Sequence, residues 1–560
     1  AGTARGAALA PTAAPGDRTE TPVASSSPIT SVAESVVRVK IPLPASVGPH
    51  PAACDWLSYL RYRDVHGPTQ SAKADRILVA QPGIFEGAGA FDSVARDTVA
   101  QAAAHGKYIE FWALDRRSNC LEDHTGTAAA LAARNPRVAI GYYYHHKRID
   151  GHAFRGFLNS GQLGWLAHVG IAQTVTDEYR LLAEELPSQA LRKQKVLCGG
   201  HSLGGTITAF FAEWDFGGHP GYQQCAGYFA LDSTISTSLG SLSGLPTGPA
   251  VHDAGLGYTA TAAGLDSGAI PRDLNLPVLI NAETENMLDI YGVAADVAPS
   301  ARNTVTSELP RDDANIDATE RLLFSRNAVN FATGYPSIRD FRFTNDAALG
   351  ALLDSNSQPL AMLEVADGFF NGHGGAVADK DFPLPSDLAR QPALQSLDGS
   401  LLGTDPLAIP ATPRGPVYGW ENYDQVGTPG NPLYYSRDGR PFTTASSEVT
   451  DIHEVARSFA EQPLDFTEWY FPTKLATDIY QKSEPQIADH LKYPNGITAN
   501  PTINLLGGSG LVIRNGVPPN GKTVVAPHYH HLDVLTASPH QNDGHPELIS
   551  ENLARFALSP

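Results

Sequence analysis

The sequence predicts an α/β fold with a mostly parallel central sheet and helices on both faces. Short apolar runs of strand length alternate with longer segments whose apolar residues recur at helical spacing, which is typical of successive strand–helix units. The runs are apolar throughout, as expected for strands that are buried on both faces. Polar or glycine-containing loops follow the runs, and one of these loops leads directly into a helix.

The first predicted units lie in the first third of the chain. Residues 76–81 form an apolar run that ends in a Pro-Gly loop, and an Ala-rich helix is expected from about residue 92 to residue 104. A second strand is expected over 107–114. Apolar residues spaced by three or four over 175–186 then mark the buried face of a helix that precedes the next strand.

The most informative segment is the apolar run 195–199 followed by the letters GHSLGG and a helix-like stretch at 206–214. A bare G-x-S-x-G pattern is weak, because 52 glycines in 560 residues produce roughly 0.3 matches by chance. The strand before it and the helix after it place Ser202 on a sharp strand-to-helix turn with an exposed hydroxyl. Gly200 and Gly204 flank the serine where a side chain would collide with neighbouring backbone.

Three further apolar runs complete the predicted sheet. Residues 226–231 and 277–281 follow the serine turn, and the second of them leads into the acidic letters AETE. Near the C-terminus, residues 522–527 run into a histidine-rich loop and the letters HLDVL. The order along the chain is therefore a serine, then an acid, then a histidine, each in a loop after a predicted strand.

On these motifs the chain resembles the α/β-hydrolase superfamily, in its esterase and lipase branch. The resemblance covers roughly residues 35–285 and 520–558 and is carried by GHSLGG, the Pro-Gly loop and the terminal HLDVL segment. It implies Ser202 as nucleophile and a carboxylate after the seventh strand of the fold, which is the run at 277–281 here. It also implies an oxyanion hole formed by the N–H groups of Leu203 and Ile84. This chemistry requires no metal and no organic cofactor.

The resemblance implies His531 as the general base, because the HLDVL segment that follows it often carries the histidine in lipases. His530 is the second candidate. A metal site is a weaker interpretation of the terminal histidines, since they lack a helical H-x-x-x-H spacing and have no cysteine nearby. The terminal histidines are His528, His530, His531, His540 and His545.

The acid is the least certain member of the predicted triad. When the loop after residue 281 is set against the G-x-x-D pattern of the superfamily, Ala282 falls at the glycine and Glu285 at the carboxylate. Glu285 is therefore the preferred acid. Glu283, Asp232 at the end of the preceding strand, and Asp289 are the alternatives.

The long segment between the predicted acid and the last strand predicts a cap over the site. The expected division is a flexible leader at 1–30, the first part of the core at 31–285, a cap inserted between the seventh and eighth strands at 286–520, and the rest of the core at 521–560. Both flanking strands end at the catalytic edge of the sheet, so the cap should emerge there. The side chains expected to contact substrate are Phe85, His201, Trp420 and Trp469.

Composition indicates an exported enzyme. The 40 basic and 59 acidic residues give a net charge of -19, which argues against nucleic acid or an anionic membrane as a partner. The first thirty residues are rich in Ala, Pro, Thr and Ser, like the linker that remains after signal cleavage, and the sequence shows no apolar segment long enough to span a membrane. The four cysteines permit three full pairings, with Cys198 expected as a lone buried thiol.

The sequence thus predicts a secreted serine hydrolase that forms an acyl-enzyme on Ser202. Its expected substrates are small-molecule, lipid or polymer esters of carboxylic acids, with a bulky hydrophobic part that the cap would cover. The same triad would serve an amidase or peptidase, because the motif specifies acyl transfer and not the leaving group. A hydrolase fold used only for binding is a third interpretation.

Overall fold

The computed structural model describes residues 16–246, 256–276, 280–389, 391, 401–516 and 520–559. Its centre is a nine-stranded sheet in the order β1-β2-β3-β5-β4-β6-β9-β17-β18. The first three strands pair antiparallel, and the six from β5 to β18 run parallel to one another. The strands are β1 Arg18–Pro22, β2 Val32–Lys40, β3 Trp56–Asp64, β4 Ile77–Gln81, β5 Glu110–Leu114, β6 Val196–His201, β9 Gly227–Leu231, β17 Thr502–Gly507 and β18 Lys522–Ala526.

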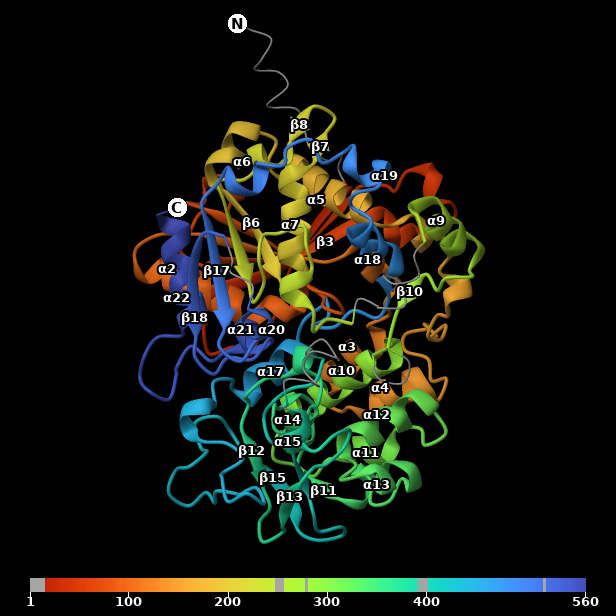
Figure 1. The fold of residues 1–560 in the computed structure, drawn as a ribbon, viewed down its shortest axis with the longest axis vertical. Helices are drawn as coiled ribbons and strands as arrows, with labels where there is room; N and C mark the ends of the chain where they lie inside the picture. Colours follow the sequence, from red (N-terminus) through yellow and green to blue (C-terminus); the bar gives the residue numbers. More distant parts are fainter. Residues whose placement is uncertain are drawn as a thin grey trace, which may run out of the picture.

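Helices cover both faces of this sheet (Figure 1). Because side chains alternate along a strand, Leu78 and Ala80 of β4 enter one core, while Ile77 and Val79 enter the other. Helices α2 (Asp92–Ala104) and α22 (Leu548–Leu558) pack on the first face, and α5 (Ile171–Glu185) and α7 (Leu203–Glu213) pack on the second. This is the α/β-hydrolase arrangement that the sequence predicts.

Most of the predicted core elements are present with nearly the predicted bounds. The apolar runs at 76–81, 195–199, 226–231 and 522–527 are strands β4, β6, β9 and β18, and the Ala-rich helix is α2. The strand expected over 107–114 begins only at Glu110.

The predicted seventh strand, at 277–281, does not take its predicted place beside β9. Residues 277–279 lie outside the described residues, but Leu276 and Ile280 on either side of them pair with each other and not with the sheet. Helix α10 (Ala282–Val297) begins directly afterwards, capped by Asn281. The place beside β9 is taken by β17, so the large insertion lies between β9 and β17.

The inserted chain forms a separate lobe, which lies below the sheet in Figure 1. Its long helices are α10, α12 (Ala314–Phe324), α14 (Asn345–Leu353) and α17 (Ile452–Ala460). Its three-stranded sheet has the order β11-β15-β12, with β11 at Arg342–Phe343, β12 at Phe369–Asn371 and β15 at Val417–Glu421. After the lobe, α18 (Thr473–Tyr480) packs against α5 of the core. The cap therefore does not extend to residue 520, because α18 and β17 belong to the core.

The remaining elements are short or peripheral to the site. The other helices are α3 Thr125–Ala133, α4 Arg137–Tyr144, α6 Gln189–Lys195, α9 Tyr258–Ser267, α11 Val305–Glu308, α13 Ala328–Thr333, α15 Ser386–Ala389, α19 Pro485–Ala488, α20 Leu511–Asn515 and α21 Asp533–Thr536. The other strands are β7 Asp215–Phe216, β8 His219–Pro220, β10 Asp273–Leu274, β13 Val377–Asp379, β14 Ala408–Pro410 and β16 Phe471–Pro472. Among the described residues, no helix is both long enough and apolar enough to cross a bilayer.

The N-terminal segment and the cysteines differ from expectation. Residues 1–15 of the predicted leader lie outside the described residues, but residues 18–22 pair with β2 as an edge strand of the sheet. Disulfides join Cys54 to Cys120 and Cys198 to Cys225. Cys198 is therefore not a lone thiol: its sulfur ties the strand before Ser202 to the loop before β9.

Candidate active site

Ser202 occupies the turn between β6 and α7, as predicted. Its backbone has φ 56° and ψ -122°, a conformation that is strained for a residue with a side chain. The turn is possible because Gly200 and Gly204 pass against the Gln81 carbonyl oxygen, where any Cβ would collide. Strain of this kind persists only where the surrounding structure enforces it, and it is typical of functional sites.

His531 lies in the loop after β18 and is paired with Asp232. Its Nδ1 lies 2.5 Å from Asp232 Oδ2, and the same carboxylate accepts hydrogen bonds from the backbone N–H groups of Gly507 and Leu511. Because a carboxylate only accepts, His531 Nδ1 carries the proton and Nε2 is left as the basic nitrogen. Within the described part of the chain, His531 Nε2 and Ser202 Oγ are both buried and form no hydrogen bond. Both residues line one pocket.

The structure corrects the predicted acid from Glu285 to Asp232. Glu285 lies in the first turn of α10, beside the Thr467 hydroxyl, and none of the described hydrogen bonds joins it to His531. Its position follows from the order of the sheet, because the strand beside β9 is β17 and Glu285 belongs to a helix of the inserted chain. Glu283, in the same turn of α10, accepts a hydrogen bond from Asn315.

His530, the second candidate for the base, is engaged elsewhere. Its Nδ1 bonds to Asp533 and its Nε2 bonds to Asp405. Burial opposes the charged form of this ring, but the two carboxylates outweigh it and raise the pKa of His530 well above its usual value. A ring held in this way is a poor general base.

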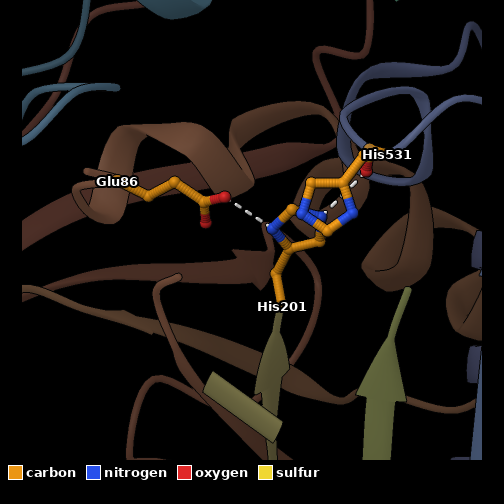
Figure 2. Close-up of side chains that lie close together, drawn as sticks. All are labelled: Glu86, His201 and His531. Carbon is orange, nitrogen blue, oxygen red and sulfur yellow. Dashed lines mark hydrogen bonds and ion pairs between the residues drawn. The ribbon is translucent and has the colours of Figure 1, made fainter. Parts of the chain in front are cut away.

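A buried pair, Glu86 and His201, lies behind the candidate base (Figure 2). His201 Nε2 donates to the backbone oxygen of His531 at 2.9 Å, and His201 Nδ1 lies 2.6 Å from Glu86 Oε1. The carbonyl can only accept, so a second proton must lie between His201 and Glu86. Burial opposes a charged imidazole, yet Glu86 outweighs it and raises the pKa of His201.

The pKa of His531 moves in the opposite direction. Burial lowers it first, and the His201 ring, whose centroid lies 4.5 Å away, lowers it further, while Asp232 opposes both. His531 is therefore held neutral, as a general base must be.

The Pro-Gly loop after β4 lies directly against the serine. A Cβ on Gly83 would lie 2.9 Å from Ser202 Cβ, so a larger residue would displace either the loop or the nucleophile. The Glu86 carboxylate accepts the Gly83 N–H and holds the loop in place. The N–H groups of Ile84 and Leu203, the predicted oxyanion hole, donate to no acceptor in the described part of the chain.

The pocket beside Ser202 has a mainly apolar lining and is almost closed. Its volume is about 30 Å³, about a tenth of the roughly 300 Å³ of a small ligand pocket, so substrate can enter only if the lining segments move apart. Phe85 lines it, as predicted. The lining residues are Ile84, Phe85, Glu86, Ser202, Leu245, Glu285, Leu288, Leu353, Met362, Leu363, Phe459, Phe466, Thr467, His531 and Leu532.

Three predicted substrate contacts do not line this pocket. Trp420 packs against Phe370 in the cap core, and its Nε1 donates to the Asp367 carbonyl. Trp469 packs edge-on against His124. His201 is fully buried and donates a hydrogen bond to the backbone oxygen of His531. The two tryptophans are thus part of the packing of the protein, which is the common fate of aromatic residues.

Sequence reasoning missed the role of Glu86 and ranked Asp232 too low. Asp232 directly follows the apolar run 226–231, just as the serine turn follows its own strand. That position at a strand end was the available signal. Glu86 has no such signal, because only the folded loop brings it to His201.

Comparisons with known proteins add little to this geometry. No protein-family model and no curated protein matches the sequence. Epoxide hydrolase A from Mycobacterium thermoresistibile is 12% identical over 96% of this chain and 98% of that chain, with a TM-score of 0.31. The peroxisomal alpha-beta-hydrolase Lpx1 from Saccharomyces cerevisiae is 11% identical over 97% of this chain and 89% of that chain, with a TM-score of 0.31. The juvenile hormone epoxide hydrolase from Bombyx mori is 10% identical over 94% of this chain and 77% of that chain, with a TM-score of 0.29. Similarity at this level does not bear on the reaction, which has to be inferred from the site itself.

Proposed function

We propose that the protein is a serine hydrolase that cleaves carboxylic esters through an acyl-enzyme on Ser202. The observation that supports it most is the hydrogen bond from His531 to Asp232, in a loop that shares a pocket with a strained, buried serine. In the proposed reaction, Ser202 Oγ attacks the ester carbonyl while His531 Nε2 takes its proton. Asp232 keeps the proton on Nδ1 and stabilises the imidazolium that forms.

The negative charge that develops on the ester oxygen requires donors fixed in advance. The N–H groups of Leu203 and Ile84 fit this role, because one begins a helix and the other lies in the loop that touches Ser202. Each donor of this kind stabilises a transition state by on the order of 3 kcal/mol. Neither N–H has another acceptor to give up among the described hydrogen bonds.

The second half of the reaction returns the enzyme to its starting state. His531 gives its proton to the departing alkoxide, and the alcohol leaves. A water molecule, deprotonated by the same Nε2, then attacks the acyl carbonyl. The acid is released, and the proton returns to Ser202.

The lining of the pocket supports esters with an apolar part. Leu288, Leu353, Phe459 and Phe466 from the inserted chain face the serine and would cover a hydrophobic group. Small-molecule, lipid and polymer esters fit this description. Export, the compartment we propose, is supported by two disulfides, which persist in oxidising surroundings.

One observation favours amides as a second candidate class. Glu285 places a buried carboxyl group in the mainly apolar pocket beside Ser202, where it could accept a hydrogen bond from an N–H group of a substrate. The triad is the same for both classes. A panel of p-nitrophenyl esters and p-nitroanilides of matched acyl groups would separate an esterase from an amidase.

The direct test is to label the nucleophile. An alkyl fluorophosphonate should modify Ser202 alone and abolish ester hydrolysis, and Ser202→Ala should lower kcat by several orders of magnitude without changing the fold. Ser446→Ala, at an exposed serine of the cap, is the matched control and should keep full activity and labelling. Labelling at another serine, or an active Ser202→Ala, would refute the proposal.

A further inference from the structure

A second polar cluster lies outside the candidate active site, on the wall of a larger cavity. This cavity, of about 1120 Å³, is bounded by the loop after β5, by α3 and α10, and by the chain segment 459–465. Phe459 lines both this cavity and the pocket beside Ser202, so the two are neighbours.

The centre of the cluster is formed by Glu122, His124 and Asp465. Each offers one nitrogen or carboxylate oxygen, and these three atoms lie within 4.8 Å of one another. Glu122 Oε1 lies 3.0 Å from His124 Nε2, and Asp465 Oδ2 lies 3.9 Å from His124 Nδ1. The loop after β5 supplies the first two residues, and the segment that returns from the cap supplies the third.

Asp289 supplies an independent observation. It projects from α10 into the same cavity, is only 2% exposed, and faces the carboxyl group of Asp465. In the described part of the chain, the neighbour of its carboxylate oxygens is another carboxyl group, Asp465, and no N–H donor reaches them. Buried acceptors without donors are rare, and each one requires an explanation.

Acidic side chains gather around Asp289. Its carboxyl group is in contact with that of Asp465, and both residues line the cavity together with Glu122 and His124. The nearby Arg116 is bound elsewhere, to Glu468 and to the Gly83 carbonyl. The cluster therefore brings three acidic side chains and one imidazole to one wall of the cavity.

We propose that this cluster binds a divalent metal ion, with Glu122, His124 and Asp465 as ligands and the buried Asp289 beside them. Two carboxylates and one imidazole suit Mn²⁺ or Zn²⁺, because carboxylates alone favour Ca²⁺ or Mg²⁺ and the imidazole nitrogen favours transition-series ions. The ion would bind ligand atoms that already lie within 4.8 Å of one another. The adjoining cavity gives access and leaves room for water ligands.

The ion would fasten the cap to the core beside the oxyanion loop. The segment that carries Asp465 is already paired with this loop: Gly87 N–H donates to Phe466, Gly89 N–H to Asp465, and Glu468 N–H to Phe85. Bound metal would hold the segment against the loop after β5. The proposal concerns binding and stability, and it does not depend on the reaction at Ser202.

The test is metal binding to the whole protein. The protein is stripped with a chelator and dialysed, and Mn²⁺ and Zn²⁺ are then titrated in by calorimetry, with bound metal measured by mass spectrometry and Tm measured with and without the ion. We expect one equivalent of at least one of the two ions and a higher Tm. Failure of the wild-type protein to bind either ion would overturn the proposal, whatever the variants do.

Variants locate the site. Asp465→Asn and Glu122→Gln should each weaken binding at least tenfold and remove the Tm increase. His124→Asn, at a side chain that is 26% exposed, should do the same with little risk of unfolding. Glu461→Gln is the matched control, because this carboxylate lines the same cavity but already accepts two hydrogen bonds from Ser26. Binding that survives in all three cluster variants would overturn the assignment of these ligands.

Discussion

Replacing Asp232 by asparagine tests the corrected triad acid most directly. Both oxygens of this carboxylate accept backbone N–H groups, one from Gly507 and one from Leu511, and the second also accepts His531 Nδ1. An asparagine keeps the shape but must place an NH₂ group against one of these donors. If it faces His531, the ring nitrogen there must become an acceptor, and the proton moves to Nε2, where it blocks proton transfer from Ser202.

The expected loss of activity and the expected loss of folding stability in Asp232→Asn differ in size. The wrong tautomer lowers kcat by about 10⁴ in triads of this kind, which corresponds to ~5.5 kcal/mol of transition-state stabilisation. The clash of donors costs about 1 to 3 kcal/mol of folding stability. For a protein of 560 residues that cost amounts to a Tm decrease of only about 1 to 3 °C. The activity loss should therefore far exceed the stability loss.

The assay is kcat and KM for p-nitrophenyl butyrate, with Tm followed by circular dichroism. Glu285→Gln, at the acid that the sequence favoured, is the comparison: it changes a carboxyl group of the pocket but not the partner of His531. We expect Asp232→Asn to lose about 10⁴ in kcat and Glu285→Gln to stay within roughly tenfold of wild type. Equal losses in the two variants, or a larger loss at Glu285, would refute the assignment.

Three further predictions follow from the same geometry. Glu86→Gln can still accept from Gly83 and donate to a neutral His201, so the positive charge that lowers the pKa of His531 disappears. This loss outweighs the smaller, opposite effect of Glu86 on His531, so the acid limb of kcat/KM should move to higher pH; an unchanged or lower limb would contradict this. Gly83→Ala brings a methyl group to 2.9 Å from Ser202 Cβ and should reduce kcat at least tenfold with an unchanged circular dichroism spectrum. Full activity would show that the loop after β4 can move away from Ser202 without effect on the reaction. The double variant C198A/C225A removes a disulfide between cysteines that are 27 residues apart in the sequence, and it should lower the free energy of unfolding in urea by about 3.5 kcal/mol. An unchanged unfolding midpoint would show that this disulfide does not stabilise the protein.

The parts of the sheet that could be predicted are those with a continuous apolar run. Strands β4, β6, β9 and β18 all have one, and each leads into a recognisable loop. Strand β1 could not be predicted, because its residues RTETP are mostly exposed at the edge of the sheet and show no hydrophobic pattern. The segment 277–281 has a suitable run, but the strand that pairs with β9 is β17. An apolar run reports burial, and only pairing in the folded protein decides whether it joins the sheet.

In the candidate site, the residues that could be predicted are those with a clear local sequence pattern. Ser202 was identified because a strand, two glycines and a helix surround it, and His531 because of the segment that follows it. Asp232 was ranked below Glu285 because the choice placed the neighbour of β9 at 277–281, whereas that neighbour is β17. The strand that pairs with β9 could not be identified from the sequence, because a long insertion separates the two. Strand β9 ends at Leu231 and β17 begins at Thr502, about 270 residues later.

The place where the cap is inserted explains why the triad residues come from the core and the pocket wall comes from the cap. Parallel strands end at the same edge of the sheet, so β6, β9 and β18 deliver Ser202, Asp232 and His531 to one place without any help from the cap. The cap enters just after Asp232, and its residues Leu353 and Phe459 form the wall that faces the serine. Changes in the core should therefore alter the rate for every substrate, whereas changes in the cap wall should alter the preference among substrates.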